Sequence, residues 1–274
     1  MLVAFDYVQS MLNLIDLFNE AEIKSVSKFC DVAKKLDITD ICDGYAELRQ
    51  VAPQRSERGK SYFGDTYRTG TTNNLKRSNR REEHCAIAMY NASRAGKNFE
   101  LPDGRNLELI DYQTPLKAQQ SDYRVGKVDL FGVVEMTLPA VIELKVEGQN
   151  GTMADTPLRA LMEGLAYCAI VEKNISAIAA ETTSKFGLPL SAATPILMIM
   201  APEKYWEQYL QHPRTGNWLP ELNRLTEGLR RRLNLETHMA ALKGADFEMG
   251  RRGKPPVLHG NCELVSVDQI AGDT

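Results

Sequence analysis

The stretch "VGKVDLFGVVEMTLPAVIELKVEG" (residues 125–148) contains two apolar runs in which charged side chains stand at intervals. Its β-branched and aromatic residues favour extended backbone, so we predict strands at Val125–Glu135 and Ala140–Glu147. Because successive side chains of a strand point to opposite faces, Glu143 and Lys145 share one face of the second strand. Asp129 lies in the first strand, where an ionisable group among apolar neighbours needs a partner or a metal ion.

A hairpin between these two strands would bring the three charged side chains together. If it turns at Thr137, Asp129 faces Lys145, and Glu143 is the diagonal neighbour of Asp129 at roughly 7 Å. Mg²⁺ binds through one or two carboxylates together with waters and phosphate oxygens, and a lysine beside it can position an attacking water. The pattern therefore suits phosphodiester hydrolysis. The alternative is an ordinary pair of opposite charges on a solvated sheet face.

The rest of the chain predicts helices and strands around this hairpin. The expected elements are two or three helices between Phe5 and Gln50, a basic connector at 51–76, a helix from Ser78 to Ala95 that stops at Gly96, a strand at Leu107–Pro115, a helix at Thr156–Lys173, a strand at 194–202, a helical stretch through about Lys243 and a late strand near "CELVSV" (262–267). This order predicts an α/β fold with a mixed sheet flanked by helices. We divide the chain into a helical N-terminal segment and basic connector (1–65) and a main domain (66–274), and leave open the alternative that residues 1–65 pack as part of the same domain.

The sequence resembles the PD-(D/E)XK superfamily of metal-dependent nucleases over about residues 78–205. The resemblance rests on Asp129 in "VDL", followed after thirteen residues by Glu143 and Lys145 in "ELK". It implies a restriction-endonuclease-like fold, here with an N-terminal helical extension. It further implies Asp129 and Glu143 as ligands of Mg²⁺ or Mn²⁺, with the Leu144 carbonyl as a further ligand, and Lys145 as the catalytic lysine. The implied substrate is DNA, cut by an endonuclease in preference to an exonuclease.

Two neighbouring helices carry further residues that the resemblance singles out. An acidic residue on the preceding helix often completes such sites, and of Glu82 and Glu83 we favour Glu83. Acidic residues near a helix N-terminus are also favourable to the helix dipole whatever the function. The following helix has Glu163 and Tyr167 four residues apart, where several of these nucleases have Gln and Tyr. Glu163 departs from that pattern, so the supporting role of this pair stays an expectation.

A local excess of basic residues is the main charge feature of a chain whose formal net charge is only -3. Residues 49–81 hold nine Lys or Arg against Glu57 and Asp65. The predicted nucleic-acid-binding residues are Arg55, Arg58, Lys60, Arg68, Lys76, Arg77, Arg80 and Arg81, with Tyr62, Phe63 and Tyr67 between them for stacking on bases. A solvated loop is the alternative, and the helical N-terminal segment is a candidate for substrate holding or for a homodimer contact.

Other classes of protein fit the sequence less well. The five cysteines are scattered without zinc spacing, so we expect buried, reduced thiols. The first residues lack a basic leader and include Asp6 and Asp16, which predicts a cytoplasmic protein without a membrane anchor. The chain has no GxSxG, HExxH or GxGxxG motif. Two further readings stay open: a non-catalytic nucleic-acid-binding or assembly subunit on the same fold, and a nuclease that acts on RNA.

Overall fold

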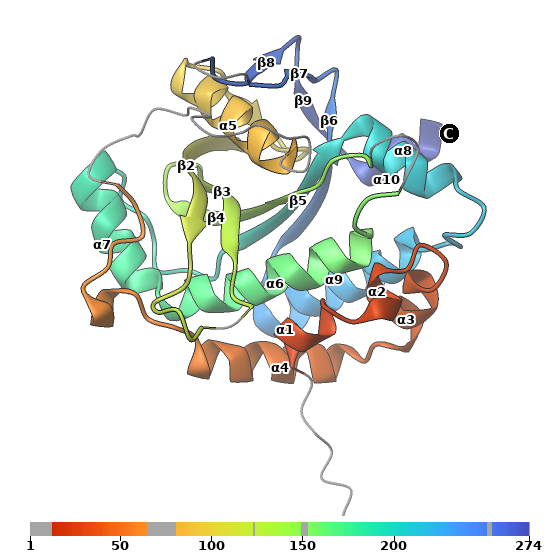
Figure 1. Ribbon diagram of the computed structural model, residues 1–274, viewed down its shortest axis with the longest axis horizontal. Helices are drawn as coiled ribbons and strands as arrows, with labels where there is room; N and C mark the ends of the chain where they lie inside the picture. Colours follow the sequence, from red (N-terminus) through yellow and green to blue (C-terminus); the bar gives the residue numbers. More distant parts are fainter. Residues whose placement is uncertain (1–12, 65–80, 123, 149–152, 251–253, 274) are drawn as a thin grey trace, which may run out of the picture.

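The computed structural model describes residues 13–64, 81–122, 124–148, 153–250 and 254–273, and its centre is a seven-stranded mixed sheet (Figure 1). The strand order is β1 (Phe99–Glu100), β2 (Asn106–Pro115), β3 (Lys127–Val134), β4 (Leu138–Leu144), β5 (Ile196–Pro202), β6 (Thr237–Lys243) and β9 (Glu263–Ser266). The pairs β4–β5 and β5–β6 are parallel, and the other neighbours are antiparallel. A separate two-stranded ribbon joins β7 (Asp246–Glu248) to β8 (Val257–His259).

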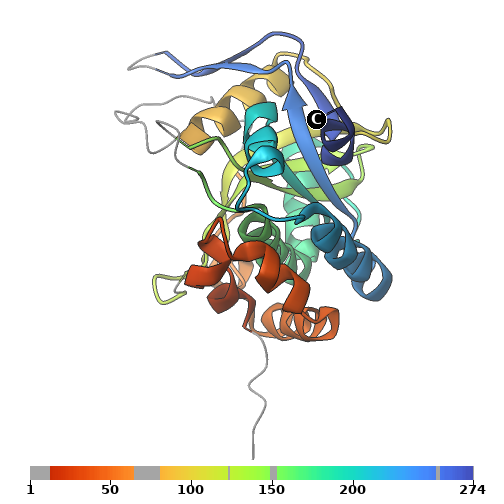
Figure 2. The same ribbon diagram turned by 90° about the vertical axis from the view of Figure 1, so that its right-hand side faces the viewer.

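Helices cover both faces of the sheet. The helices are α1 (Leu14–Leu17), α2 (Ala21–Lys24), α3 (Phe29–Lys35), α4 (Ile38–Val51), α5 (Arg81–Arg94), α6 (Pro157–Lys173), α7 (Ile175–Phe186), α8 (Glu203–Gln211), α9 (Leu219–Leu233) and α10 (Val267–Asp273), with a short 3₁₀ turn at Ser56–Arg58. Helix α6 packs on β4 and β5, and the N-terminal helices lie outside it. Figure 2 shows α1–α4, in red and orange, on one side of the sheet, and α5 with the β7–β8 ribbon on the other.

The central strands are buried on both faces, which explains their near-continuous apolar sequence. Val141 of β4 belongs to the core under α6, whereas Ile142 and Leu144 belong to the core under α5. Gly164 lets α6 approach the sheet closely, because a Cβ atom there would lie 2.6 Å from Leu197 Cδ1. The side of β4 that carries Glu143 therefore faces α6 across a short gap.

Most of the expected elements are confirmed, including the mixed sheet flanked by helices. Helix α6 begins where predicted, because the Thr156 side chain accepts a hydrogen bond from the Arg159 N–H at 3.2 Å. Helix α5 ends before Gly96, whose φ of +94° is the left-handed conformation that glycine adopts most easily. The five cysteines are free and buried, as expected. None of the described helices has the length and apolar character needed to cross a bilayer.

Three local predictions were wrong. Residues 237–243 were expected to continue a helix, but they form β6, because parallel pairing with β5 outweighs the helix preference of Ala, Met, Leu and Lys. Helix α7 was not predicted at all, and the described part of the N-terminal segment contains four helices in place of two or three. The late strand near "CELVSV" is confirmed as β9, which pairs antiparallel with β6 and is the last strand at that edge of the sheet.

The hairpin register also differs from the prediction, by two residues. Leu130 pairs with Ile142 and Val134 pairs with Leu138, so the loop is centred on Met136 and the position opposite Asp129 is Glu143. Met136 has a φ of +60°, which places the turn one residue earlier than predicted. Because side chains alternate with period two, a shift of two residues leaves each of them on its predicted face.

The N-terminal helices share a core with the rest of the chain. Leu14 of α1, Phe29 of α3 and Tyr45 of α4 belong to the same buried cluster as Leu158 of α6. The Tyr45 hydroxyl donates a hydrogen bond of 2.5 Å to Glu172 at the far end of α6. In the part of the chain that the structure describes, residues 13–63 thus pack directly on the helix that faces Glu143 and Lys145.

Candidate active site

The centre of the candidate site is an ion pair at the carboxyl end of β4. Lys145 Nζ donates a hydrogen bond of 2.6 Å to Glu143 Oε1. Both residues are almost fully buried, with 3% of Glu143 and 2% of Lys145 exposed. Their side chains share the α6 face of the strand, as predicted from their spacing. The Lys145 N–H donates to Met200 O of β5 at 2.8 Å, so parallel pairing with β5 holds the backbone of the lysine.

Asp129 on β3 lies beside this pair and is fixed by two hydrogen bonds. The Leu144 N–H donates to Asp129 Oδ2 at 3.0 Å, and Gln113 Nε2 donates to Oδ1 at 2.8 Å. Gln113 lies on β2, whose pairing with β3 shifts between Leu109 and Asp111. Burial raises the pKa of Asp129 to about 7, although the nearby Lys145 ammonium opposes the shift.

Four polar side chains at intervals of four residues line the α6 side of the site. Asp155 precedes the helix, and Arg159, Glu163 and Tyr167 follow along one of its faces. Lys145 Nζ lies 3.5 Å from Glu163 Oε2 and 4.0 Å from Asp155 Oδ2. Arg159 bridges the two carboxylates: it contacts Asp155 and lies 3.1 Å from Glu163 Oε2. The Tyr167 hydroxyl donates to Glu163 Oε1 at 3.0 Å, so the two predicted supporting residues meet.

The first turn of α5 adds a further carboxylate. Glu82 Oε1 lies 3.9 Å from Lys145 Nζ, and burial raises the pKa of Glu82. Glu83 belongs to the same turn, and its carboxylate acts on the neighbouring His84, where it opposes the lowering of the pKa by burial. We favoured Glu83 as the acidic residue of this helix that completes the site. The structure instead places the Glu82 carboxylate beside Lys145.

Among the described residues, the site holds more carboxyl groups than cationic groups. Five carboxylates surround two cations: Asp129, Glu143, Glu163, Glu82 and Asp155 against Lys145 and Arg159. Burial raises the pKa of Glu143 well above its usual value, and Lys145 offsets part of that shift. Burial alone would lower the pKa of Lys145, but Glu143 and Glu163 outweigh it, so the ammonium is strongly favoured. Such a site attracts a further cation.

Within the described residues, three buried polar atoms of the site lack a hydrogen-bond partner: Glu143 Oε2, Glu163 Oε2 and Arg159 Nε. Glu143 Oε2 is buried and accepts no hydrogen bond from the part of the chain that the structure describes. An unsatisfied buried carboxylate oxygen beside other carboxylates is what a hard divalent cation would use as a ligand. The donor set of Asp129, Glu143 and Glu82 thus fits Mg²⁺ or Mn²⁺ chemically. Lys145 now lies among these oxygens, so a bound cation would share Glu143 with it.

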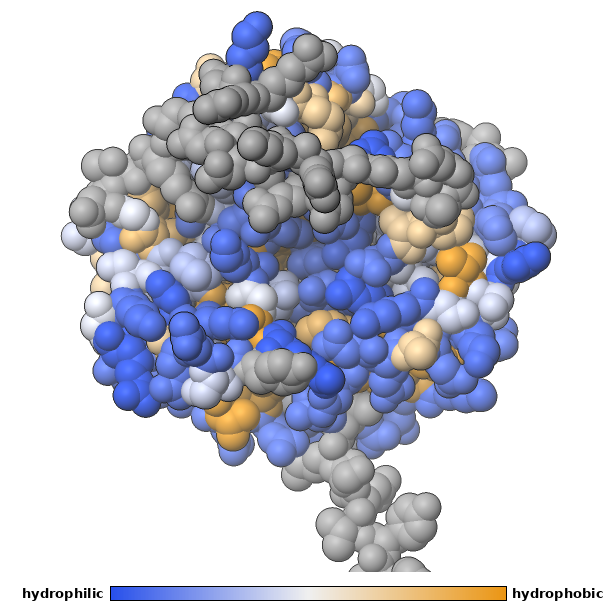
Figure 3. All heavy atoms as spheres, in the orientation of Figure 1, coloured by the Kyte–Doolittle hydropathy of each residue, from blue (hydrophilic) through white to orange (hydrophobic). Residues whose placement is uncertain are grey.

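On the face shown in Figure 3, mainly hydrophilic residues line a hollow near the centre, between α5 above and α6 below in the matching view of Figure 1. Asp129 as a residue is half-buried, and 37% of the Glu82 side chain is exposed. Glu143 and Lys145, by contrast, are almost fully buried. A polar ligand would therefore meet Asp129 and Glu82 before it reaches the ion pair.

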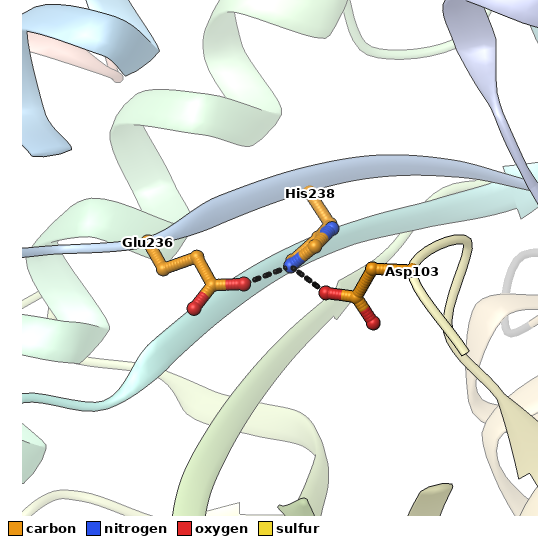
Figure 4. Close-up of side chains that lie close together, drawn as sticks. All are labelled: Asp103, Glu236 and His238. Atoms are coloured by element: carbon orange, nitrogen blue, oxygen red, sulfur yellow. Dashed lines mark hydrogen bonds and ion pairs between the residues drawn. The ribbon is translucent and has the colours of Figure 1, made fainter. Parts of the chain in front are cut away.

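Within the described residues, three potential metal ligands approach one another closely at a different place. Figure 4 shows Asp103, Glu236 and His238, whose ligand atoms lie within 4.8 Å of one another. Arg105 also belongs to this cluster: its guanidinium contacts Glu236 and lies 2.5 Å from Asp103 Oδ2. Because the arginine already supplies the cation that these carboxylates attract, we interpret the cluster as an ion-pair network that ties residues 103–105 to β6.

The described residues of the predicted nucleic-acid-binding set have mixed surroundings. Arg55 donates to the backbone oxygens of Ser61 and Lys117, and Lys60 donates to Ala118 O at 2.5 Å, so both hold loops together. Arg58 is exposed, and Arg81 pairs with Glu147. The predicted nucleic-acid contacts at Arg68, Lys76, Arg77, Arg80 and Tyr67 lie outside the described residues.

The expected stacking role of two aromatic residues was wrong. Tyr62 is 2% exposed and Phe63 is 4% exposed, so neither ring is available to a base. Phe63 packs edge-on against Phe131, with 5.3 Å between ring centroids, and Tyr62 lies under the Arg55 guanidinium. These rings fix the connector against the core.

Three residues of the site were missed in the sequence. Asp155 and Arg159 lie eight and four residues before Glu163, so the helical period that linked Glu163 to Tyr167 could have found them. Gln113 gave no such signal, because its contact with Asp129 depends on the pairing of β2 with β3.

Comparison of the chain with protein-family models, with curated proteins and with solved structures finds no match. The assignment of function therefore depends on the chemistry of the site.

Proposed function

We propose that the protein is a nuclease of the PD-(D/E)XK type, which uses Mg²⁺ or Mn²⁺ to hydrolyse phosphodiester bonds in DNA on a restriction-endonuclease-like fold. The observation that carries the proposal is the convergence of Asp129, Glu143 and Lys145 at the carboxyl end of β4. It is supported by the excess of carboxylates over cations around Lys145 and by the unsatisfied Glu143 Oε2. An ion pair with a purely structural role would not need the additional carboxylates.

In this proposal, Asp129 and Glu143 hold the metal ion, with Glu82 and the Leu144 carbonyl as further ligands. When bound, the ion supplies Lewis-acid stabilisation of charge on the scissile phosphate. Lys145 positions the attacking water, and its ammonium neutralises charge that develops on the phosphate oxygens. Glu163 holds Lys145 in place from α6, whereas Arg159 pairs with Glu163 and the Tyr167 hydroxyl orients it. Gln113 and the Leu144 N–H fix the orientation of Asp129.

A cleavage assay tests the proposal. Supercoiled plasmid, linear duplex, single-stranded DNA and RNA are incubated with Mg²⁺, Mn²⁺ or EDTA. We expect metal-dependent nicking or linearisation of plasmid DNA that Glu143→Ala and Lys145→Ala abolish. The matched control is the second Glu-x-Lys triplet of the chain, Glu22 to Lys24 on α2, whose substitution by alanine should leave cleavage unchanged.

The variants also separate the alternatives. Equal cleavage by wild type and by folded Glu143→Ala or Lys145→Ala protein would contradict the proposed site. Binding of nucleic acid without turnover in any metal would favour a non-catalytic binding or assembly subunit, and cleavage of RNA alone would change the substrate. Folding of each variant is checked by its melting temperature in EDTA.

A further inference from the structure

A cavity of about 310 Å³ begins next to the candidate active site, on the opposite face of the sheet. Val146 and Glu147, which follow Lys145, form one wall, and Arg81 and Cys85, which flank Glu82 on α5, form another. Val146 belongs to the core under α5, whereas Lys145 points toward α6. The site and the cavity thus meet at the carboxyl end of β4.

The β7–β8 ribbon and the segments next to it close the cavity from the outside. Phe247 and Met249 line it from this side, and Pro202 lines it from the end of β5. The Gly250 N–H donates to His84 Nδ1 at 2.9 Å, which fastens this part of the chain to α5. Figure 2 shows the ribbon and α5 on the same side of the sheet. The cavity therefore has a fixed aromatic and aliphatic wall.

The charges that line the cavity do not suit a phosphate group. Among the lining residues that the structure describes, three carboxylates, Glu147, Glu203 and Asp246, outnumber the two cations Arg81 and Lys204. Arg81 is further committed, because its guanidinium contacts the Glu147 carboxylate and donates to Glu147 O at 2.9 Å. The surroundings instead suit a neutral planar group that is partly apolar and donates hydrogen bonds to carboxylates.

We propose that this cavity holds the base of a nucleotide next to the scissile phosphate, with Phe247 as its stacking surface. The inference rests on the proposed nuclease function. The volume lies at the lower end of the range for small-molecule sites, roughly 300–1,000 Å³, which suits one nucleoside-sized group. Enzymes that extract a base hold it between aromatic or apolar side chains and read its edge by hydrogen bonds. Because carboxylates accept from exocyclic amino groups, the cavity favours adenine, guanine and cytosine over thymine.

The test measures binding in EDTA, where a metal-dependent enzyme does not cut. The probe is a short single-stranded DNA with one 2-aminopurine, whose fluorescence falls when the base stacks. We expect wild type to quench the probe, and Phe247→Ala to reduce the quenching and weaken binding by roughly five-fold to hundred-fold. Leu258→Ala is the matched control, because Leu258 pairs with Phe247 across the ribbon but does not line the cavity.

A second probe has an abasic nucleotide in place of the 2-aminopurine. Wild type should bind it as weakly as Phe247→Ala binds the first probe. Equal quenching by wild type and Phe247→Ala, or no binding of the first probe, would overturn the base site. Plasmid cleavage by the same wild-type protein is scored separately: cleavage without a Phe247 effect rejects only the base site, whereas quenching without cleavage keeps the base site and rejects the nuclease.

Discussion

Lys145 donates a 2.6 Å hydrogen bond to Glu143 two residues before it on the same strand, and both side chains are almost fully buried. A buried ion pair recovers the cost of desolvation only when its geometry is good and further partners satisfy both groups. Here the partners are unequal in number. Lys145 has additional carboxylates at 3.5 Å and 3.9 Å, from Glu163 and Glu82, whereas Glu143 Oε2 has no hydrogen-bond partner among the described residues.

This inequality predicts that the two halves of the ion pair differ in their effect on stability. In EDTA near pH 8, Lys145→Met should lower the free energy of unfolding by about 3 kcal/mol, because it leaves several buried carboxylates with Arg159 as their remaining cation. Glu143→Gln should change it by less than about 1 kcal/mol, since Lys145 keeps Glu163 and Glu82. Urea unfolding of the three proteins measures both values.

The loss from Lys145→Met should also shrink as the pH is lowered toward 5, because protonation neutralises the carboxylates that the lysine no longer balances. Equal losses in the two variants would show that the ion pair is balanced by itself and that the surrounding carboxylates do not act on it. That result would remove the main electrostatic support for a cation site.

Divalent cations should stabilise the folded protein. At a concentration about a hundred times the dissociation constant, Mn²⁺ or Mg²⁺ should add about 2.7 kcal/mol, which raises the melting temperature by roughly 5 °C. Glu143→Gln should remove most of this shift, because it converts the carboxylate that carries the unsatisfied oxygen into a neutral amide. Asp246→Asn, an exposed carboxylate outside the site, is the control. A shift that Glu143→Gln leaves intact would place the cation elsewhere, for instance at Asp103 and Glu236.

The metal effect should depend on pH in a defined direction. Burial raises the pKa of Asp129 from its ordinary 3.8 to about 7. Between these values the metal-free folded protein holds a proton that the unfolded chain has released, so this group's contribution to stability falls as the pH rises through the window. A divalent cation needs the ionised carboxylate, so the Mn²⁺-induced shift in melting temperature should grow as the pH rises through about 7 and level off roughly one unit above the pKa, at about pH 8. In Asp129→Asn, the shift should be small and flat across this range.

Much of the fold was predictable because its strongest signals are local. The apolar runs around Phe131 and Val141, the N-cap at Thr156 and the glycine stop at Gly96 depend on residues close in sequence. Residues 237–243 failed because their partner strand, β5, lies far away along the chain, and Ala, Met, Leu and Lys by themselves favour helix. Pairing between distant strands overrides such local preferences.

As with the fold, the sequence predicted the parts of the candidate site that depend on local spacing. The strand period placed Glu143 and Lys145 on one face, and this did not depend on the hairpin register. The choice between Glu82 and Glu83 depended on how α5 lies against the sheet, and the contact of Gln113 with Asp129 depended on the register of β2. Residues close in sequence determine neither the position of Glu82 nor the contact of Gln113 with Asp129, so both features became known only from the tertiary structure.

The ion-pair network around Arg105 should stabilise the protein modestly. Hydrogen bonds from Arg105 lower the pKa of Asp103, and the His238 ring lowers that of Glu236. Because the side chains are a quarter to two-fifths exposed, Arg105→Gln should cost only about 1 kcal/mol near pH 7. Both carboxylates have lowered pKa values, so the difference from wild type is present above about pH 4 and is lost as the pH falls below it. High salt should also reduce the difference in stability between wild type and Arg105→Gln, as measured by thermal unfolding. A difference that changes with neither salt nor pH would show that Arg105 acts through packing.

A tight contact behind the site predicts a coupling between Gly126 and Tyr167. A Cβ atom at Gly126 would lie 2.2 Å from the Tyr167 hydroxyl, which donates to Glu163. Gly126→Ala should therefore destabilise the protein by about 1–3 kcal/mol and displace the phenol from Glu163. Tyr167→Phe removes the hydroxyl, so Gly126→Ala should cost about 1 kcal/mol less in that background than in wild type. Gly272→Ala, where a Cβ atom meets nothing within 4 Å, is the control. Strict additivity of the two changes would mean that Gly126 does not hold Tyr167 in place.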